Sequence, residues 1–121
     1  MAKDLEITLL FDIYGEMLTQ KQRDFITYYY DDDLSLSEIA ENEGITRQGV
    51  RDSIKRAEAQ LLDFEAHLGL KRKFDELRQG LREIEDMTEI IREVNLRTIL
   101  SREINDAVSR IHSVVKLLGE E

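Results

Sequence analysis

Small and apolar residues occupy, between Leu36 and Ala57, the fixed offsets that two short helices require when they cross steeply through a tight turn. Ala40 stands where the second helix has to pass close to the first, so a larger side chain would collide with it. Gly44 follows four residues later and can take the left-handed backbone conformation that ends a helix. Val50 and Ile54 recur at helical spacing and point to one side. The segment therefore predicts a helix-turn-helix within an all-α fold, and nucleic-acid binding is the first hypothesis.

The ends of the two predicted helices carry capping residues. Ser37 is the expected N-cap of the first helix, which would begin at Glu38, where the helix dipole favours an acidic side chain. Ile45 is expected to fill the core beneath the turn. Thr46 is expected to cap the second helix.

Composition favours a helical protein. The 121 residues include no proline, and 36% of them are charged, a balance typical of helices rather than of a sheet-rich core. There is no cysteine, so neither a disulfide framework nor a thiolate metal site is expected, in keeping with a reducing compartment. The N-terminus lacks the pattern of a signal peptide, and no apolar run approaches membrane-spanning length. We expect a soluble cytoplasmic protein without a membrane partner.

Amphipathic spacing predicts further helices before and after the motif. One helix is predicted over residues 3–18, and the next begins after Thr19, whose hydroxyl and the Gln22 side chain fit a capping box. The second helix of the motif has no stop signal before Gly69, so it is predicted to run over residues 47–67. The side chains that the helix after Thr19 should bury are Phe25, Ile26 and Tyr29, with Tyr28 as a further candidate.

Apolar residues beyond Gly69 alternate spacings of three and four, which is the seam of a coiled coil or of a helical hairpin. The first seam consists of Leu70, Phe74, Leu77, Leu81, Ile84, Met87, Ile91 and Val94. A reversal is predicted at residues 95–98, with a continuous helix as the alternative because the stretch has neither glycine nor proline, and the second seam consists of Leu100, Ile104, Ala107, Ile111, Val114 and Leu118. Such seams must be covered by each other, by the first domain or by a second copy, and a homodimer is expected. Residues 1–69 are thus predicted as a helix-turn-helix domain and residues 70–121 as a C-terminal helical extension.

Several stretches around the motif carry a resemblance to a known family. They are Leu-Thr-Gln-Lys-Gln-Arg-Asp at 18–24, the tyrosines at 28–30, the acidic turn at 31–33, Leu34-Ser35-Leu36-Ser37-Glu38-Ile39-Ala40 and Ile45-Thr46-Arg47-Gln48. Together they resemble the YlxM family of small bacterial proteins. The first half is also similar to region four of sigma factors of the extracytoplasmic-function type, through Val50, Arg51, Ile54, Arg56 and Ala57. The resemblance implies a regulatory role linked to the signal recognition particle pathway.

The exposed face of the second helix would supply the DNA contacts if its N-terminus entered the major groove. Arg47, Gln48 and Arg51 are the candidates for base edges, because arginine pairs with guanine and glutamine with adenine. Side chains further along the helix, and the hydroxyl or amide at its start, are expected at phosphates. The candidates for phosphate are Thr46, Lys55 and Arg56.

Charge argues against simple DNA binding. Of the formal net charge of −9, residues 1–69 carry −8, with 7 basic and 15 acidic side chains, whereas non-specific affinity comes from neutralising phosphates. Two residues also depart from the usual motif. Glu43 stands before the turn glycine, where an apolar residue is usual. Gly49 lies inside the second helix at a cost of roughly 1 kcal/mol relative to alanine, which packing, the close approach of a partner or erosion of DNA reading would each explain.

Other polar features carry less weight. Asp31 to Asp33 lack the spaced ligands and the glycine of a metal loop, and His67 and His112 are isolated from any catalytic partner. Tyr28 to Tyr30 fit a core cluster better than a base-stacking platform, and Lys71 to Lys73 fit the polar start of a helix as well as an RNA contact. No phosphate-cradling glycine loop is present, so no enzymatic activity, metal or cofactor is expected.

Two classes of function follow. The first is a DNA-binding regulator that reads a site with residues 1–69 and dimerises through its C-terminal helices. The alternative is a protein-interaction module that does not bind DNA and modulates targeting by docking on the protein or RNA of the signal recognition particle. Contact with RNA polymerase, in the manner of region four, is a weaker third hypothesis. A positive strip along Arg47, Arg51 and Lys55 would favour DNA, and an acidic or covered second helix would favour a protein partner.

Overall fold

The computed structural model describes residues 3–120, and this part of the chain contains six α-helices and no strand. This confirms the all-α fold. The chain divides into two compact units at Lys71, here called the N-terminal unit and the hairpin. The elements in order are α1 (Leu5–Tyr14), a 3-10 turn η1 (Gly15–Met17), α2 (Gln20–Ile26), a π-helical turn η2 (Thr27–Asp31), α3 (Leu36–Glu43), α4 (Arg47–Leu68), α5 (Leu70–Arg97) and α6 (Arg102–Gly119).

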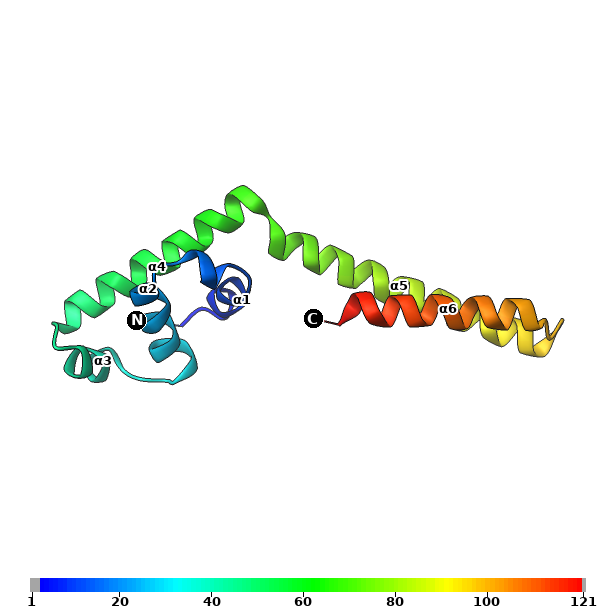
Figure 1. Ribbon diagram of the computed structural model, residues 1–121, viewed down its shortest axis with the longest axis horizontal. Helices are drawn as coiled ribbons and strands as arrows, with labels where there is room; N and C mark the ends of the chain where they lie inside the picture. Colours follow the sequence, from blue (N-terminus) through cyan, green and yellow to red (C-terminus); the bar gives the residue numbers. More distant parts are fainter. Residues whose placement is uncertain (1–2, 121) are drawn as a thin grey trace. The chain divides into compact units, whose positions relative to one another are not determined.

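In the N-terminal unit the three shorter helices α1, α2 and α3 all pack against the long helix α4 (Figure 1). One row of α4 faces them, and its side chains at 50, 54, 57 and 61 are fully buried. The apolar residues of the four helices form a single cluster. Its most completely buried large side chains are Ile7, Leu10, Tyr14, Phe25, Ile26, Ile39, Val50, Ile54 and Leu61.

The start of α2 is confirmed as a capping box. The Thr19 hydroxyl accepts a hydrogen bond from Gln22 N at 3.2 Å, and Gln22 Oε1 accepts one from Thr19 N at 3.0 Å. The helix before it is shorter than predicted, because α1 ends at Tyr14 and the chain tightens into η1 from Gly15 onward. The side chains that were predicted to be buried behind the cap are buried at Phe25, Ile26 and Tyr29 and half-buried at Tyr28.

The helix-turn-helix is formed by α3 and α4. Gly44 ends α3 with φ at 68° in the left-handed region, as predicted, and an added Cβ would meet no atom within 4 Å, so the backbone conformation alone favours glycine here. Ala40 is buried, and Val50 and Ile54 are fully buried. Thr46 caps α4, because its hydroxyl accepts a hydrogen bond from Gly49 N at 2.9 Å. These positions of the motif are confirmed.

Two predicted details of the motif are wrong. The N-cap of α3 is Ser35 rather than Ser37, because Ser35 and Glu38 form a reciprocal capping box, with bonds of 3.1 Å in each direction, and the helix therefore begins at Leu36, which is buried. Ile45 does not fill the core. Its side chain is 38% exposed and lines a groove beside α4.

A shared hydrogen-bond cluster joins the end of α4 to the start of α5. Gly69 ends α4 with φ at 62°, so α4 runs almost as predicted. The Tyr14 hydroxyl donates to Glu65 Oε1 at 2.7 Å and accepts from Leu70 N at 3.0 Å, while Lys71 N donates to the same Glu65 oxygen at 3.0 Å. Two side chains of the N-terminal unit thereby satisfy amide donors in the first turn of α5, which have no helical partner.

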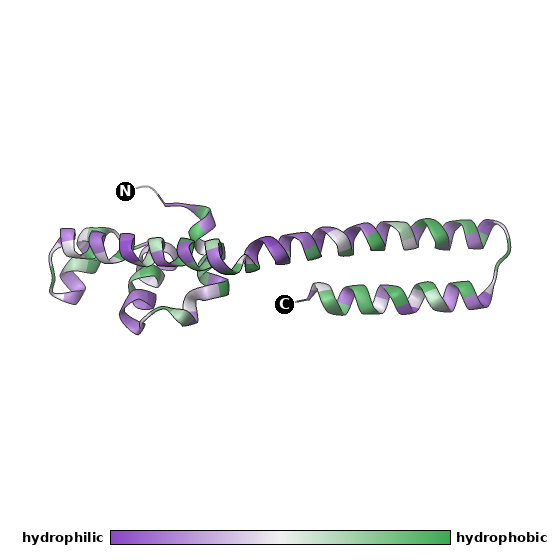
Figure 2. Ribbon diagram, turned by 90° about the horizontal axis from the view of Figure 1, so that it is seen from above, coloured by the Kyte–Doolittle hydropathy of each residue, from purple (hydrophilic) through white to green (hydrophobic). Residues whose placement is uncertain are grey.

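Helices α5 and α6 lie side by side and antiparallel in both ribbon views (Figures 1 and 2). The reversal falls at residues 98–101, slightly later than predicted, and Asn95 holds it. Asn95 Nδ2 donates to the Ser101 carbonyl at 2.9 Å, and Ser101 N donates to Asn95 Oδ1 at 2.8 Å. None of the helices in residues 3–120 has an apolar stretch long enough to span a bilayer.

The contact between the two hairpin helices differs from the predicted seams. The buried residues of α6 are Val108 and Val115, one position after the predicted Ala107 and Val114. On α5 the buried positions are seven residues apart, and two of them are polar. They are Leu81, Thr88 and Asn95. Most apolar residues of the predicted seams therefore stay partly exposed within one chain.

Candidate nucleic-acid interface

The exposed surface of α4 is divided into three rows by the helical repeat of 3.6 residues. Arg47, Arg51 and Lys55, four residues apart, form a row along one flank of the buried stripe. Gln48 and Asp52 form the row that faces away from the core. On the other flank lie Gly49, Ser53 and Arg56. The structure thus brings together three of the six predicted site residues and separates Arg56 from them.

The two polar side chains of the outward row of α4 bond to each other. Gln48 Nε2 donates a hydrogen bond to Asp52 Oδ1 at 2.9 Å. The amide that was predicted to read adenine is therefore engaged by a carboxylate one turn away, and it would have to exchange this partner for a base. The carboxylate of Asp52 is also the one acidic group among residues 46–56.

The second flank of α4 borders a groove of about 420 Å³. Its far wall is the start of α2, which contributes Thr19, Lys21 and Gln22, and the turn residue Ile45 also lines it. A hydrogen bond of 2.9 Å from Gln22 Nε2 to Gln60 Oε1 ties α2 to α4 along this side. The residues of α4 that line the groove are Gly49, Ser53 and Arg56.

Basic side chains gather around α4 without a close ion pair to a carboxylate of the described residues. No carboxylate of residues 3–120 lies within the 4.0 Å ion-pair distance of their charged groups. Since residues 1–69 hold 7 basic side chains, most of the positive charge of this acidic region is available to an external anion. The basic residues concerned are Lys21, Arg47, Arg51, Lys55 and Arg56.

Carboxylates lie on neighbouring elements. Glu38, Glu41 and Glu43 are exposed on α3. The Glu43 carboxylate raises the pKa of the Tyr28 hydroxyl above its ordinary value, so the position that departs from the usual motif is an exposed charge beside a tyrosine. In the acidic turn, an ion pair with Lys3 lowers the pKa of Asp33. The exposed carboxylates of α3 would repel a nucleic acid, whereas the charge of Asp33 is offset by Lys3.

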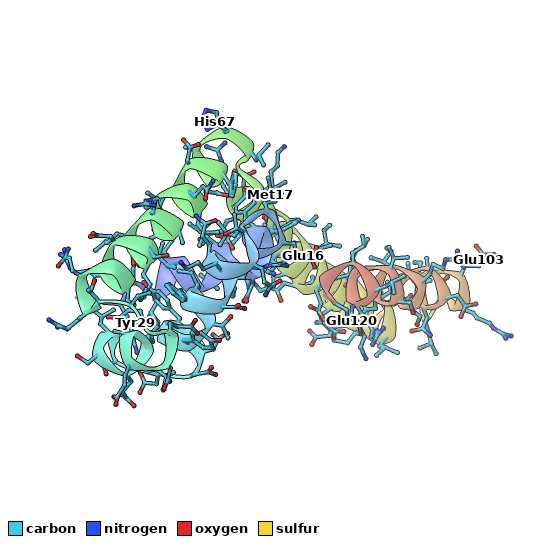
Figure 3. All side chains as sticks on the ribbon, turned by 60° about the vertical axis from the view of Figure 1, so that its left-hand side comes forward. Glu16, Met17, Tyr29, His67, Glu103 and Glu120 are labelled. Atoms are coloured by element: carbon cyan, nitrogen blue, oxygen red, sulfur yellow. The ribbon has the colours of Figure 1, made fainter. Side chains whose placement is uncertain are left out.

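The remaining polar candidates show no site. His67 lies at the C-terminal end of α4 and points away from the other helices of the N-terminal unit (Figure 3). His112 lies 3.6 Å from Glu89 within the hairpin. In the part of the chain that is described, no group of three or more histidine, cysteine or acidic side chains is placed to hold a metal ion.

Sequence reasoning missed the groove. Ser53 follows Gly49 at a spacing of four on α4, so the pattern already placed both on one flank. Lys21 could not be assigned to that flank from the sequence, because it belongs to a different helix and reaches the groove through the packing of α2 on α4.

The sequence matches known proteins over most of its length. Residues 1–99 match the model of the UPF0122 family, whose description is "Putative helix-turn-helix protein, YlxM / p13 like". A UPF0122 protein of Desulforamulus reducens is 49% identical over 79 residues, which cover 65% of this chain and 68% of the relative. One from Bacillus mycoides is 45% identical over 101 residues, covering 78% and 92% respectively. One from Shouchella clausii is 48% identical over 84 residues, covering 69% and 77%.

Proposed function

Because the chain belongs to the UPF0122 family of YlxM-like helix-turn-helix proteins, we propose that it is a cytoplasmic DNA-binding regulator whose helix α4 enters the major groove. Arg47, Gln48 and Arg51 contact base edges, and the remaining candidates contact phosphate. Residues 1–69 form the DNA-reading domain. The candidates for phosphate are Thr46, Lys55 and Arg56.

The observation that carries this proposal is the set of basic side chains along α4 that form no close ion pair with a carboxylate of the described residues. A solvated helix face in a region with 15 acidic side chains would be expected to engage some of its cations in ion pairs. Instead Arg47, Arg51 and Lys55 form a row that no carboxylate approaches within 4.0 Å. A local positive strip of this kind attracts phosphates even where the net charge is negative.

Selection of DNA fragments by the full chain, followed by variants of α4, tests this function. Arg51→Ala is expected to cost about 1 to 3 kcal/mol at the selected site and to relax discrimination at one base pair, because a bidentate arginine–guanine contact is lost. Arg47→Ala should behave similarly. Arg102→Ala on α6, which removes the same charge from an exposed position, is the control. Unchanged binding of both α4 variants would reject the proposal, as would tighter binding to duplex RNA, whose deep and narrow major groove does not admit a helix.

The exposed apolar residues of the hairpin support a homodimer. Residues three and six positions after the buried positions of each helix, and Leu77, seven residues before Ile84, lie on one side of the hairpin, since the two helices are antiparallel and each carries the same repeat of seven. These apolar side chains are between 38% and 55% exposed. We propose that residues 70–121 pair with a second copy through this dimer face, as in a four-helix bundle. The dimer face comprises Leu77, Ile84, Met87, Ile91 and Val94 on α5 and Ile111, Val114 and Leu118 on α6.

A second candidate function is a protein-interaction module that binds components of the signal recognition particle without binding DNA. The hydrogen bond between Gln48 and Asp52 favours this candidate, because it engages the side chain at the centre of the exposed face of α4. The exposed carboxylates of α3 favour it as well. Purified particle protein and RNA, titrated separately against the full chain, test this candidate. Absence of binding to either, together with sequence-selective DNA binding, would exclude it.

A further inference from the structure

We propose that the groove between α2 and α4 holds the phosphate backbone of the DNA strand beside α4, with Lys21 and Arg56 as its cationic contacts. This inference rests on the proposed DNA-binding function and adds a phosphate site on a second element of the domain. The groove has a volume of about 420 Å³ and is open to solvent.

The position of the groove fits the geometry of a helix in DNA. An α-helix with its side chains is about 10 to 12 Å wide, and the major groove is about 12 Å wide. A helix lying in it therefore faces a phosphate wall on both sides. The row of Arg51 and Lys55 lies on one flank of α4, and Arg56 with the groove lies on the other, so each flank offers positive charge to one strand.

Two small residues make the groove accessible from α4. Gly49 lines the groove without a side chain, and the Cβ of any other residue there would lie 3.1 Å from the Thr46 hydroxyl that caps α4 and 3.8 Å from Cδ1 of Ile45, which also lines the groove. Ser53 is half-buried one turn later and lines the same wall. The absence of a side chain at Gly49 thus lets a phosphate approach the helix closely, which accounts for a glycine that costs helix stability.

The opposite wall of the groove is held in place before any ligand binds. The capping box of Thr19 and Gln22 fixes the first turn of α2, and Gln22 also bonds to Gln60 of α4 at 2.9 Å. The Lys21 ammonium lies 5.7 Å from the centre of the Phe25 ring, so its aliphatic stem follows the surface of α2. A cation held in this way loses less freedom on binding a phosphate than a lysine on a mobile loop.

The test measures the salt dependence of DNA binding for Lys21→Ala and Arg56→Ala in the full chain. Each variant should bind all sequences more weakly by a similar factor and should lower the slope of log K against log salt by about 0.9, the value for one lost phosphate contact. Ser53→Asp, which places a carboxylate in the groove, should weaken binding further. Lys116→Ala on α6 removes the same charge outside the groove and controls for net charge.

The outcomes separate this inference from the proposed function. If DNA is bound and Arg51→Ala weakens that binding, but the slopes of Lys21→Ala and Arg56→Ala equal that of Lys116→Ala, the groove is not a phosphate site and DNA reading stands. If Lys21→Ala changes sequence preference rather than the salt slope, the assignment to phosphate is also wrong. If the unaltered chain binds no DNA, both proposals fall together.

Discussion

Glu58 is a carboxylate that the fold largely removes from water. Its side chain lies on α4 and is 9% exposed, and its Oε1 atom has no hydrogen-bond partner within residues 3–120. Burial raises the pKa of Glu58, and the charge of Asp4 adds to this effect, whereas Lys55 and the Tyr30 hydroxyl oppose it. Burial also raises the pKa of Tyr30, to about 12. The ionised Glu58 carboxylate therefore lowers the stability of the folded state by an amount that depends on pH.

The substitution Glu58→Gln is expected to stabilise the protein at neutral pH. The folded state holds the Glu58 proton at pH values where the unfolded chain has lost it, so stability falls as the pH rises from the ordinary glutamate pKa through the raised one. Glutamine removes this loss, and a gain of about 1 kcal/mol at pH 7 is expected, the size of one incompletely paired buried polar group. Urea unfolding between pH 4 and pH 7 measures it.

The gain from Glu58→Gln should shrink toward pH 4, where the wild-type carboxyl is protonated in both states. Glu41→Gln removes the same charge from an exposed position on α3 and should leave the pH profile unchanged. Parallel profiles for Glu58→Gln and the wild type would show that burial does not raise this pKa.

At the scale of single residues, the motif could be predicted from the sequence at positions where the backbone conformation or the close packing allows only one type of residue. Gly44 and Ala40 are such positions, and both were predicted correctly. Ser35 and Ser37 are equally good caps by type, and only the reciprocal bond with Glu38 selects Ser35; the Ser-x-x-Glu spacing was a signal for it. The exposure of Ile45 had no local signal, because it depends on which neighbours reach the turn.

Asn95 determines the reversal between α5 and α6. It is buried, its side chain bonds twice to Ser101, and its backbone carbonyl accepts from Leu100 N at 2.7 Å. This last contact holds Leu100 at φ 53°, a conformation that side chains other than glycine adopt at a cost. The two side-chain bonds to Ser101 thus stabilise a turn that contains neither glycine nor proline.

The substitution Asn95→Ala is expected to loosen the hairpin tip by about 1 to 2 kcal/mol, because two side-chain hydrogen bonds are lost in a buried place. Hydrogen exchange at the amides of Leu100 and Ser101 should rise by roughly one order of magnitude for each 1.4 kcal/mol. Asn105→Ala, at an exposed position of α6, serves as the matched control. Unaltered exchange in Asn95→Ala would mean that the loop backbone alone defines the turn.

The predicted seam of α6 was one residue away from the buried positions, and this error has a physical reason. Apolar residues of α6 occupy adjacent positions, Ala107 with Val108 and Val114 with Val115, so a repeat of seven can be drawn through either pair. The buried choice is set by the partner helix, since Thr88 and Asn95 of α5 face it. Polar residues in a contact are invisible to a search for apolar spacing. The other repeat stays partly exposed, and it forms the face for which we propose pairing with a second copy.

At the scale of the whole molecule, the dimer proposal predicts that stability depends on protein concentration. Thermal unfolding of the full chain should shift to higher temperature as concentration rises, because only the folded copies associate. Sedimentation should give twice the 14.2 kDa mass of one chain. Ile91→Glu, a change within the dimer face, should raise the dissociation constant at least tenfold, about 1.4 kcal/mol.

Two comparisons make the dimer prediction decisive. Gln79→Glu introduces the same charge at an exposed position of α5 outside the dimer face and should leave association unchanged. A melting temperature that is independent of concentration, with sedimentation as a single chain, would show that the exposed apolar residues serve another contact. In a dimer, the two α4 helices would read half-sites separated by about 34 Å or a multiple of it.

The hydrogen bonds that Tyr14 and Glu65 accept from the first amides of α5 connect the order of that helix start to the packing of α1 on α4. The amides of Leu70 and Lys71 are protected by Tyr14 and Glu65, and Tyr14 is itself buried in the core of the N-terminal unit. These amides can therefore exchange with solvent only when α1 and α4 separate or the cap breaks. The exchange rates of these two amides at the start of α5 therefore measure how often the packing of α1 on α4 opens.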